Sequence, residues 1–356
     1  MKSKLRAKDI IAATAAMICI SVVLVYILNK VTNYIFINST ESIVFDDGTS
    51  AVWSVDELPA KCDILEIVSF EDGQTIRENY SNGYSLSESY FLCLGKESLN
   101  DKTLSEIAQL DIREIILDVD FSNIDPLSNM QSLESLVVSR SAENFSPKFS
   151  GNFPNLKSLI IWAKIDSLGD ISKITSLREF ELGFTSFDGG ISGIENLTNL
   201  EILDLSYTNV SDIGRLANLV KMRELYLDYT NVYDISALQN MKDLEVFSSQ
   251  QNYNNNRGKL HITDITALAN KPKLREVYLY GSDITDIAPL ENDLALEKAE
   301  LSYTGITSVK PLMNLKNLKE VGVYGCDGVN DSELEEFKNW LRSLDHDVIY
   351  CGNKLS

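Results

Sequence analysis

The chain has 356 residues, and its 52 acidic side chains outnumber the 32 basic ones, which gives a formal net charge of −20 at pH 7. A field of this sign repels nucleic acids, anionic lipids and anionic polymers, which excludes them as main ligands. A cationic partner suits this charge, and acidity that serves only solubility explains it equally well.

The first predicted element is a membrane-spanning helix over residues 10–28, a segment without a charged side chain. As a helix it would be about 28 Å long, close to the roughly 30 Å hydrocarbon layer of a bilayer. Basic residues precede it between Lys2 and Lys8, and only Lys30 follows closely. Residues 1–9 are therefore predicted to stay in the cytoplasm and the rest to be exported. A cleaved signal peptide is the alternative, although its apolar core would be shorter and no small-x-small site follows.

Two regions lie between the predicted anchor and the clear repeats. Residues 29–60 show little repeat signal and are predicted to be a stalk or linker, or the start of a cap. Residues 61–110 are predicted to form an N-terminal cap with a first weak repeat that begins at Ser89. In this cap, residues 64–70 are typical of a strand. The sequence Thr-Leu-Ser-Glu from Thr103 has the form of a capping box that starts a short helix.

Residues 111–328 repeat a leucine pattern with a period close to 22. The clearest turn begins at Leu200 and follows the pattern L-x-x-L-x-L, typical of a short strand whose alternate residues point inward. One turn cannot bury its own apolar face, so the pattern predicts a solenoid of stacked turns with about eleven strands, the weak repeat included. The aligned first positions of the clear turns are Ile112, Leu133, Leu156, Leu177, Leu200, Met222, Leu244, Leu274, Leu296 and Leu318.

The segments that return the chain to the next strand are too short for a long helix, and we expect turns or 3₁₀ segments there. In four of them an aspartate precedes an inward isoleucine, where it is expected to accept backbone N–H bonds and start a tight turn. These aspartates are Asp212, Asp234, Asp264 and Asp286. The turn from Leu244 holds eight extra residues within residues 251–258, which predicts an outward loop.

The repeats resemble the internalin-type, 22-residue class of leucine-rich repeat, and the sequence Ile-Thr-Asp-Ile-Ala-Pro-Leu from Ile284 is similar to its convex phrase. The resemblance covers about residues 110–325. It implies an α/β solenoid, a leucine-rich-repeat horseshoe with short parallel strands on the concave face and turns or 3₁₀ segments on the convex face. With the transmembrane helix added at the N-terminus, this is the predicted fold class.

One position departs from the family pattern. Such repeats usually place Asn after the second strand leucine, where its amide bonds neighbouring turns. A hydroxyl can donate to only one backbone carbonyl, so a two-pronged ladder is not expected in this chain. The residues at this position are Thr208, Thr230, Ser282 and Thr304.

Residues 329–356 are predicted to form a C-terminal cap. The sequence Ser-Glu-Leu-Glu from Ser332 has the form of a second capping box, and apolar residues follow it at helical spacing. Residues 347–350 are typical of a closing strand. A cap is required because an open last turn would expose core leucines and an unpaired sheet edge.

Four cysteines lie outside the predicted anchor and allow three pairings. Cys62 and Cys93 lie in the N-terminal cap, whereas Cys326 and Cys351 lie near the C-terminal cap. Disulfides Cys62–Cys93 and Cys326–Cys351 would lock the two ends of the solenoid. A reducing source would keep all four as thiols.

The concave face of the strands is predicted to be the binding surface, with residues from the third, fifth, seventh and eighth positions of each turn. Of these forty positions, nine are aromatic, against about four expected from the composition, and ten are acidic. Aromatic side chains on rigid strands offer contact area with little entropy to lose, and acidic neighbours favour a basic partner. The predicted partner-binding residues are Trp162, Glu179, Glu181, Phe184, Asp204, Tyr207, Glu224, Tyr226, Asp228, Tyr229, Glu276, Tyr278, Tyr280, Glu300, Tyr303 and Tyr324.

Aromatic residues that share one position on adjacent turns can instead pack on each other and stabilise the sheet, and both roles can hold at once. No nucleophile motif, phosphate loop or metal-ligand spacing occurs, so we predict no catalytic residue, no cofactor and no metal site. The predicted function is binding of a protein or peptide with a basic surface, and not of nucleic acid. The predicted location is the cell membrane, with the repeats outside it. A structural envelope component without a specific ligand is the alternative.

Overall fold

The computed structural model describes most of the repeats and parts of both ends. The described residues are 43–44, 50–52, 54–70, 89–95, 100–118, 123–138, 150–162, 170–182, 187, 190–251 and 261–355. The predicted membrane helix at residues 10–28, Phe184 and residues 252–260 of the long turn lie outside these ranges. Within them, no helix combines the length and the apolar character needed to cross a membrane.

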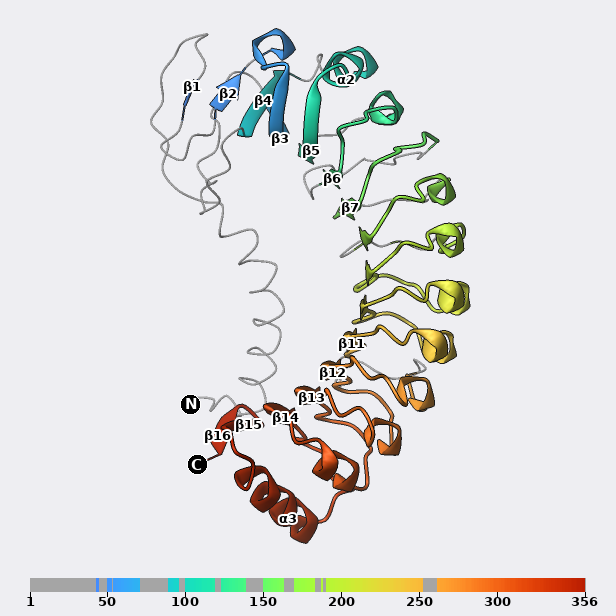
Figure 1. The fold of residues 1–356 in the computed structure, drawn as a ribbon, viewed down its shortest axis with the longest axis vertical. Helices are drawn as coiled ribbons and strands as arrows, with labels where there is room; N and C mark the ends of the chain where they lie inside the picture. The colour runs from blue at the N-terminus through green and yellow to red at the C-terminus, as the bar shows by residue number, and fades with distance from the viewer. Residues whose placement is uncertain are drawn as a thin grey trace, which may run out of the picture.

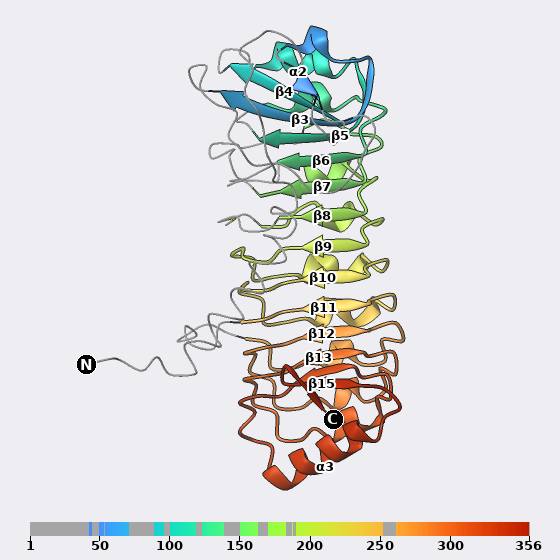
Figure 2. The same ribbon diagram turned by 90° about the vertical axis from the view of Figure 1, so that its left-hand side faces the viewer.

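The described strands form one open sheet on the inner side of a horseshoe, and 3₁₀ turns line its outer side (Figure 1). The sheet order is β1-β2-β4-β3-β5 and then chain order to β16. Neighbours from β2 to β15 are parallel, whereas the end pairs β1–β2 and β15–β16 are antiparallel. Figure 2 shows the strands stacked along the length of the molecule. The predicted solenoid of parallel strands is confirmed.

The bounds of the described elements follow the repeat pattern closely. The strands are β1 (Ile43–Val44), β2 (Ser50–Val52), β3 (Lys61–Phe70), β4 (Ser89–Gly95), β5 (Asp111–Asp118), β6 (Ser135–Val138), β7 (Ser158–Ile161), β8 (Glu179–Glu181), β9 (Ile202–Asp204), β10 (Glu224–Tyr226), β11 (Val246–Ser248), β12 (Glu276–Tyr278), β13 (Lys298–Glu300), β14 (Glu320–Gly322), β15 (Val348–Tyr350) and β16 (Asn353–Leu355). The helices are α2 (Asp101–Ile107), α3 (Asp331–Arg342), η1 (Val55–Glu57), η3 (Asp125–Leu127), η4 (Ile171–Lys173), η5 (Ile194–Asn196), η6 (Gly214–Asn218), η7 (Ser236–Asn240), η8 (Thr266–Leu268), η9 (Ala288–Leu290) and η10 (Lys310–Asn314).

The leucines of the repeat form one continuous core between the sheet and the 3₁₀ turns. In the turn from Leu200, the side chains of Leu200, Leu203 and Leu205 are fully buried. Burial of each such leucine stabilises the fold by about 2 kcal/mol. Ile202 and Asp204 alternate with them, lie on the opposite face of the strand and are half-buried. The alternation predicted from the sequence therefore separates a core face from a concave face.

Hydroxyl side chains after the second strand leucine bond within their own turn. Thr208 Oγ1 donates to the carbonyl oxygen of Leu205 at 2.6 Å, and Thr230 Oγ1 donates to that of Leu227 at 2.7 Å. The same bond recurs in later turns. Each hydroxyl satisfies one carbonyl three residues earlier, and Thr208 and Thr230 also accept from the backbone N–H two residues later.

The recurring aspartates start the 3₁₀ turns as predicted. The backbone N–H of Gly214 donates to Asp212 Oδ1 at 2.8 Å, and Ser236 N donates to Asp234 Oδ1 at 2.8 Å. Asp264 and Asp286 accept the equivalent bonds. The carboxylate thereby satisfies a backbone donor at the start of the tight turn.

Two neighbouring turns place charges in an otherwise apolar column of the core. The column lies three residues before each leading residue and holds apolar side chains such as Leu219. Lys271 and Asp293 take this position in later turns, and both are fully buried. Lys271 N donates to Asp293 Oδ1 at 2.6 Å, and its ammonium donates to two backbone carbonyls of an earlier turn. Burial raises the pKa of Asp293 to about 6 and lowers the pKa of Lys271 to about 8.

The N-terminal cap differs from the sequence prediction in its strand order. The weak repeat at Ser89 was expected to precede the turn of Ile112 directly, but β3 lies between β4 and β5. Both β3 and β5 are longer than the repeat strands, and they pair over most of their length. The sheet also extends through β2 and β1 into the segment predicted as a stalk, so it has more strands than the eleven expected.

Both predicted cap helices form, but each begins earlier than its predicted capping box. Asn100 caps α2 and accepts bonds from the N–H groups of Lys102 and Thr103, so Thr103 lies inside the helix. Asn330 caps α3 and accepts from Glu333 N. An Asn side chain satisfies the first backbone donors as well as Ser or Thr does. The predicted closing strand is confirmed by β15, and β16 pairs with its outer edge.

The predicted disulfide Cys62–Cys93 does not fit the structure. The register of β3 and β4 pairs Cys93 with Val68, six residues beyond Cys62, which is about 20 Å along a strand. A disulfide needs Cα atoms within about 7 Å. At the other end, Cys326 and Cys351 are separate thiols. Cys326 Sγ donates to Leu301 O at 3.2 Å, whereas Cys351 Sγ accepts from a backbone N–H.

Candidate functional site

Two rows of side chains run across the concave face, because parallel strands in register align equal positions. The third-position row reads Glu179, Ile202, Glu224, Val246, Glu276, Lys298 and Glu320 from β8 to β14. The fifth-position row reads Glu181, Asp204, Tyr226, Ser248, Tyr278, Glu300 and Gly322 over the same strands. Eight of the sixteen predicted binding residues therefore lie in these two adjacent rows.

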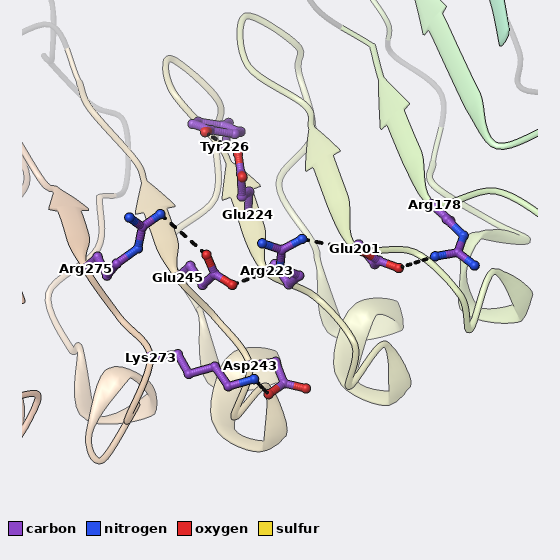
Figure 3. A network of polar contacts seen from close by, with 9 residues as sticks. All are labelled: Arg178, Glu201, Arg223, Glu224, Tyr226, Asp243, Glu245, Lys273 and Arg275. Carbon is purple, nitrogen blue, oxygen red and sulfur yellow. Dashed lines mark hydrogen bonds and ion pairs between the residues drawn. The ribbon is translucent and has the colours of Figure 1, made fainter. Parts of the chain in front are cut away.

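Two tyrosines of the fifth-position row are tied to glutamates of the third-position row on the same strand. Tyr226 Oη donates to Glu224 Oε2 at 2.8 Å, and Tyr278 Oη donates to Glu276 Oε2 at 2.6 Å. Burial raises the pKa of both tyrosines, and the acceptor carboxylate raises it further. Both phenols therefore stay protonated and act as donors that fix the carboxylates. Figure 3 shows Glu224 extending towards Tyr226.

The strand between these two pairs, β11, carries small or short side chains. Val246 stands between Glu224 and Glu276 in the third-position row, and Ser248 stands between the two tyrosines. Both are buried. Strands β10 and β12 are two strand spacings apart, about 9.6 Å. We call Glu224, Tyr226, Glu276 and Tyr278, with Val246 as their floor, the glutamate–tyrosine clamp.

Asp228 holds the floor of the clamp in place. Its Oδ1 accepts from Ser248 Oγ at 2.6 Å and from Gln250 N at 2.7 Å, and its Oδ2 accepts from Gln250 Nε2 at 3.2 Å. Burial raises the pKa of Asp228 to about 6, while the hydrogen bonds from Gln250 and Ser248 oppose the rise. Asp228, predicted as a binding residue, thus has both carboxylate oxygens bonded to Ser248 and Gln250.

On the other side of the clamp a basic residue of the chain already lies on the acidic face. Lys298 Nζ is 5.2 Å from the centroid of the Tyr278 ring and 2.9 Å from Glu320 Oε2. Lys298 and Glu320 come from adjacent strands in the third-position row. This lysine shows how a cation is held on this surface, by one aromatic ring and one carboxylate.

Glu181, an acidic residue nearer the N-terminal end, is partly protonated near neutral pH. Burial raises the pKa of Glu181 to about 7, and the charges of Asp204 and Glu179 raise it further. A hydrogen bond from Trp162 acts in the opposite direction. Burial also raises the pKa of Asp204, whose Oδ1 accepts from Ser206 N at 2.7 Å. Glu181 and Asp204 face each other across β8 and β9, so their charges repel.

A second set of predicted tyrosines packs into a ladder at the ends of the strands. Tyr207 and Tyr229 stack with ring centroids 4.7 Å apart, and Tyr303 contacts Tyr280 and Tyr324 edge to face at 5.2 and 5.4 Å. The rings of this ladder are not in the core, and Tyr324 is 49% exposed. The stabilising role considered for these tyrosines is therefore present in the structure.

The eighth position of each turn also carries a backbone requirement. Tyr207, Tyr229 and Tyr303 have φ of +60°, +57° and +60°, in the left-handed region. Gly281 and Gly325 take this position in other turns with φ of +72° and +70°. The strand ends in the same tight turn whichever residue is present. Stacking between rings offsets part of the cost of this conformation for tyrosine.

A charge ladder beside the concave rows was not predicted, although the second position of every clear turn is charged and alternates in sign from Arg178 onward. Figure 3 shows Glu201 between Arg178 and Arg223, at 3.0 and 3.7 Å, and Glu245 between Arg223 and Arg275, at 2.8 and 3.4 Å. The same position pairs further residues towards both ends. These arginines form ion pairs with glutamates of the ladder, and in the concave rows Glu320 is paired with Lys298.

The comparisons with known proteins agree with this architecture. The chain is similar in structure to an internalin of Listeria monocytogenes, with a TM-score of 0.60 and 19% identity over 81% of this chain and 79% of the other. The chain has a leucine-rich-repeat fold. A leucine-rich-repeat protein of Leptospira interrogans is also similar, with a TM-score of 0.52 and 17% identity, over 73% of this chain and 78% of the other. No protein-family model matches the sequence, and no curated protein matches it.

Proposed function

We propose that this leucine-rich-repeat chain binds a protein or peptide with a basic surface on its concave face. The observation that carries the proposal is the clamp, where two tyrosine-bound carboxylates flank an apolar floor on a rigid sheet. Rigid aromatic groups beside uncompensated charge are suited to partner recognition, because little entropy is lost when they are covered. The internalin-like fold supports the same use of the concave side.

We also propose that residues 10–28 anchor the chain in a membrane with the repeats on the outer side. The support is the charge-free length of this segment and the basic residues before it. Protease treatment of intact cells tests it, since the repeats should be cleaved from the surface while residues 1–9 remain protected. Protection of the repeats until the membrane is opened would contradict the proposal.

A structural envelope role without a specific ligand is the second candidate. The tyrosine ladder and the charge ladder favour it, because both stiffen the sheet without requiring a partner. We rank it lower, since neither ladder accounts for the clamp. Under this role, deletion of the chain would change envelope integrity while no partner is captured at stoichiometric amounts.

The binding proposal is tested with the full chain by crosslinking on intact cells, identification of the captured protein and titration of that protein. The triple variant Glu224→Gln, Tyr226→Ala, Tyr278→Ala should weaken binding by more than about tenfold, because it removes the centre of the contact surface. Tyr233→Ala is the matched control, since Tyr233 is 49% exposed but lies in a return segment. Equal affinity of the triple variant and the wild type, with unchanged circular dichroism, would overturn the concave site.

A further inference from the structure

Val246 stands in the third-position row between two glutamates, and we call the space above it the gap. The next gap in this row, towards the C-terminal end, is filled by a lysine of the chain. In the third-position row, Lys298 stands between Glu276 and Glu320. Val246 stands in the equivalent place between Glu224 and Glu276. In the described part of the chain, no basic side chain lies within ion-pair distance of Glu224 or Glu276. These two carboxylates accept hydrogen bonds from Tyr226 and Tyr278 instead. The row thus presents two fixed carboxylates without a cation between them.

We infer that this gap receives one arginine side chain of the partner, whose guanidinium bridges Glu224 and Glu276 above Val246. The inference rests on the proposed function and names its recognition chemistry. The two carboxylates lie on strands about 9.6 Å apart. A guanidinium that donates at about 2.8 Å to a carboxylate on each side spans about 8 to 9 Å between the carboxylate carbons. The spacing of the two strands therefore matches the span of one arginine bridge.

Arginine suits the gap better than lysine, as the position of Lys298 in the same row illustrates. Lys298 stands between two glutamates but forms an ion pair with Glu320, at 2.9 Å. A compact ammonium reaches one carboxylate well, whereas a planar guanidinium has donors on both sides. The tyrosine hydroxyls occupy one oxygen of each clamp carboxylate and set its orientation, which suits a directional donor.

The tyrosines of the clamp and Val246 beneath them also favour the binding of a cationic side chain. Tyr278 already lies under the Lys298 ammonium, which shows that its ring accepts a cation. Val246 and Ser248 are shorter than the glutamates and tyrosines on either side of them in the two rows, and both are buried. The position of Ile202, between Glu179 and Glu224, lacks this arrangement. On the strand of Glu179, the fifth position holds Glu181 instead of a tyrosine. The clamp is therefore the place in the two rows with a pair of tyrosine-held carboxylates.

The test titrates the full chain with three synthetic hexapeptides, of arginine, of lysine and of citrulline. Citrulline keeps the shape of arginine and removes its charge. Hexa-arginine should bind several-fold more tightly than hexa-lysine, and hexa-citrulline should not bind measurably. In the double variant Glu224→Gln, Glu276→Gln, the affinity for hexa-arginine should fall by about tenfold or more. Equal affinity for the arginine and lysine peptides would overturn the inference.

A charge-matched control separates the clamp from the general acidity of the chain. Asp327→Asn with Glu336→Gln removes the same charge from exposed positions near the C-terminal end and should leave the affinity for hexa-arginine within about twofold. An equal loss in both double variants would mean non-specific attraction and overturn the inference. If the crosslinked partner binds the Glu224→Gln, Glu276→Gln variant as well as the wild type, the arginine inference fails while the proposed function stands. If no partner binds the wild type, the proposed function itself fails.

A third variant gives an independent reading. Val246→Lys should place a lysine of the chain in the gap, as Lys298 is placed in its own. The variant should keep the wild-type circular dichroism spectrum and melting behaviour but lose hexa-arginine binding, since the carboxylates are then neutralised internally. A folded Val246→Lys chain that binds hexa-arginine at wild-type affinity would contradict the inference.

Discussion

At the scale of single residues, the eighth position of several turns, just after the strand, has a left-handed backbone and holds tyrosine or glycine. Three of the seven tyrosines predicted to bind a partner, Tyr207, Tyr229 and Tyr303, also occupy left-handed backbone positions, which are unfavourable for most side chains. Gly281 and Gly325 at the same position were a signal in the sequence for this turn, but tyrosine in the other turns concealed it. The count of aromatic residues therefore mixed two roles, which only the tertiary structure separates into the tyrosine ladder and the clamp.

Gly325 tests the cost of this position. Its φ is +70°, and an added Cβ would lie 2.8 Å from Tyr303 Cδ1. We expect Gly325→Ala to destabilise the fold by about 2 to 3 kcal/mol, from backbone strain and from displacement of the tyrosine ring. Gly352→Ala is the control, because φ is +78° there but no atom lies within 4 Å of the added Cβ. Equal losses in urea denaturation would mean that the ring contact is unimportant.

Glu181 gives a prediction on pH. Its folded pKa is raised from 4.5 to about 7, so the folded state holds the proton more tightly than the unfolded state. Its contribution to stability is therefore lost as pH rises between these two values. Glu181→Gln removes this loss, so its melting temperature relative to the wild type should rise from about pH 4.5 to about pH 7 and then level off. A constant difference in thermal melts from pH 4 to 9 would contradict the assignment.

At the scale of elements, the sequence predicted the caps but misplaced their starts and their order. Capping boxes marked both helices, yet Asn100 and Asn330 take the capping position because their side chains reach the first backbone donors. The exchange of β3 and β4 had no local signal. Which strand lies next to β5 depends on how well two long strands pair across the sheet. The spacing of leucines along the sequence does not predict this pairing.

The capping assignment of α3 can be tested with two single substitutions. Asn330→Ala should cost about 1 kcal/mol in the free energy of unfolding, because Glu333 N loses its side-chain acceptor. Ser332→Ala should stay within about 0.5 kcal/mol, since Ser332 lies inside the helix and is exposed. The reverse ranking in denaturant titrations would restore the capping box at Ser332.

At the scale of the whole molecule, charge is sorted by position in the repeat. The second position carries the paired ladder, while the third and fifth positions keep most carboxylates without a cation. The third and fifth positions of the ten turns together hold eight acidic residues and one basic residue, which is part of the net charge of −20. Because the turns stack in register, residues at one position of the repeat form a row. The type of charge at that position in each turn therefore sets the charge along the entire row.

This distribution predicts a salt-dependent affinity for a basic partner. Raising the ionic strength from about 0.1 to about 1 M shortens the Debye length from about 10 to about 3 Å and should weaken binding by about tenfold or more. The Glu224→Gln, Glu276→Gln variant should show a shallower dependence, because two of the attracting charges are gone. An affinity of the captured partner that does not change with salt would assign the binding to apolar contacts.

The sequence alone determined the solenoid, its period, its core and the acidic, aromatic character of its concave face, because each turn repeats one local pattern that must stack to bury its leucines. Only the tertiary structure decided which neighbours meet across the strands. Register set Val246 between two tyrosine-bound glutamates, paired the arginines of the ladder and separated Cys62 from Cys93. Such lateral contacts join residues about 22 positions apart, so they depend on insertions and on cap pairing that no single turn reveals.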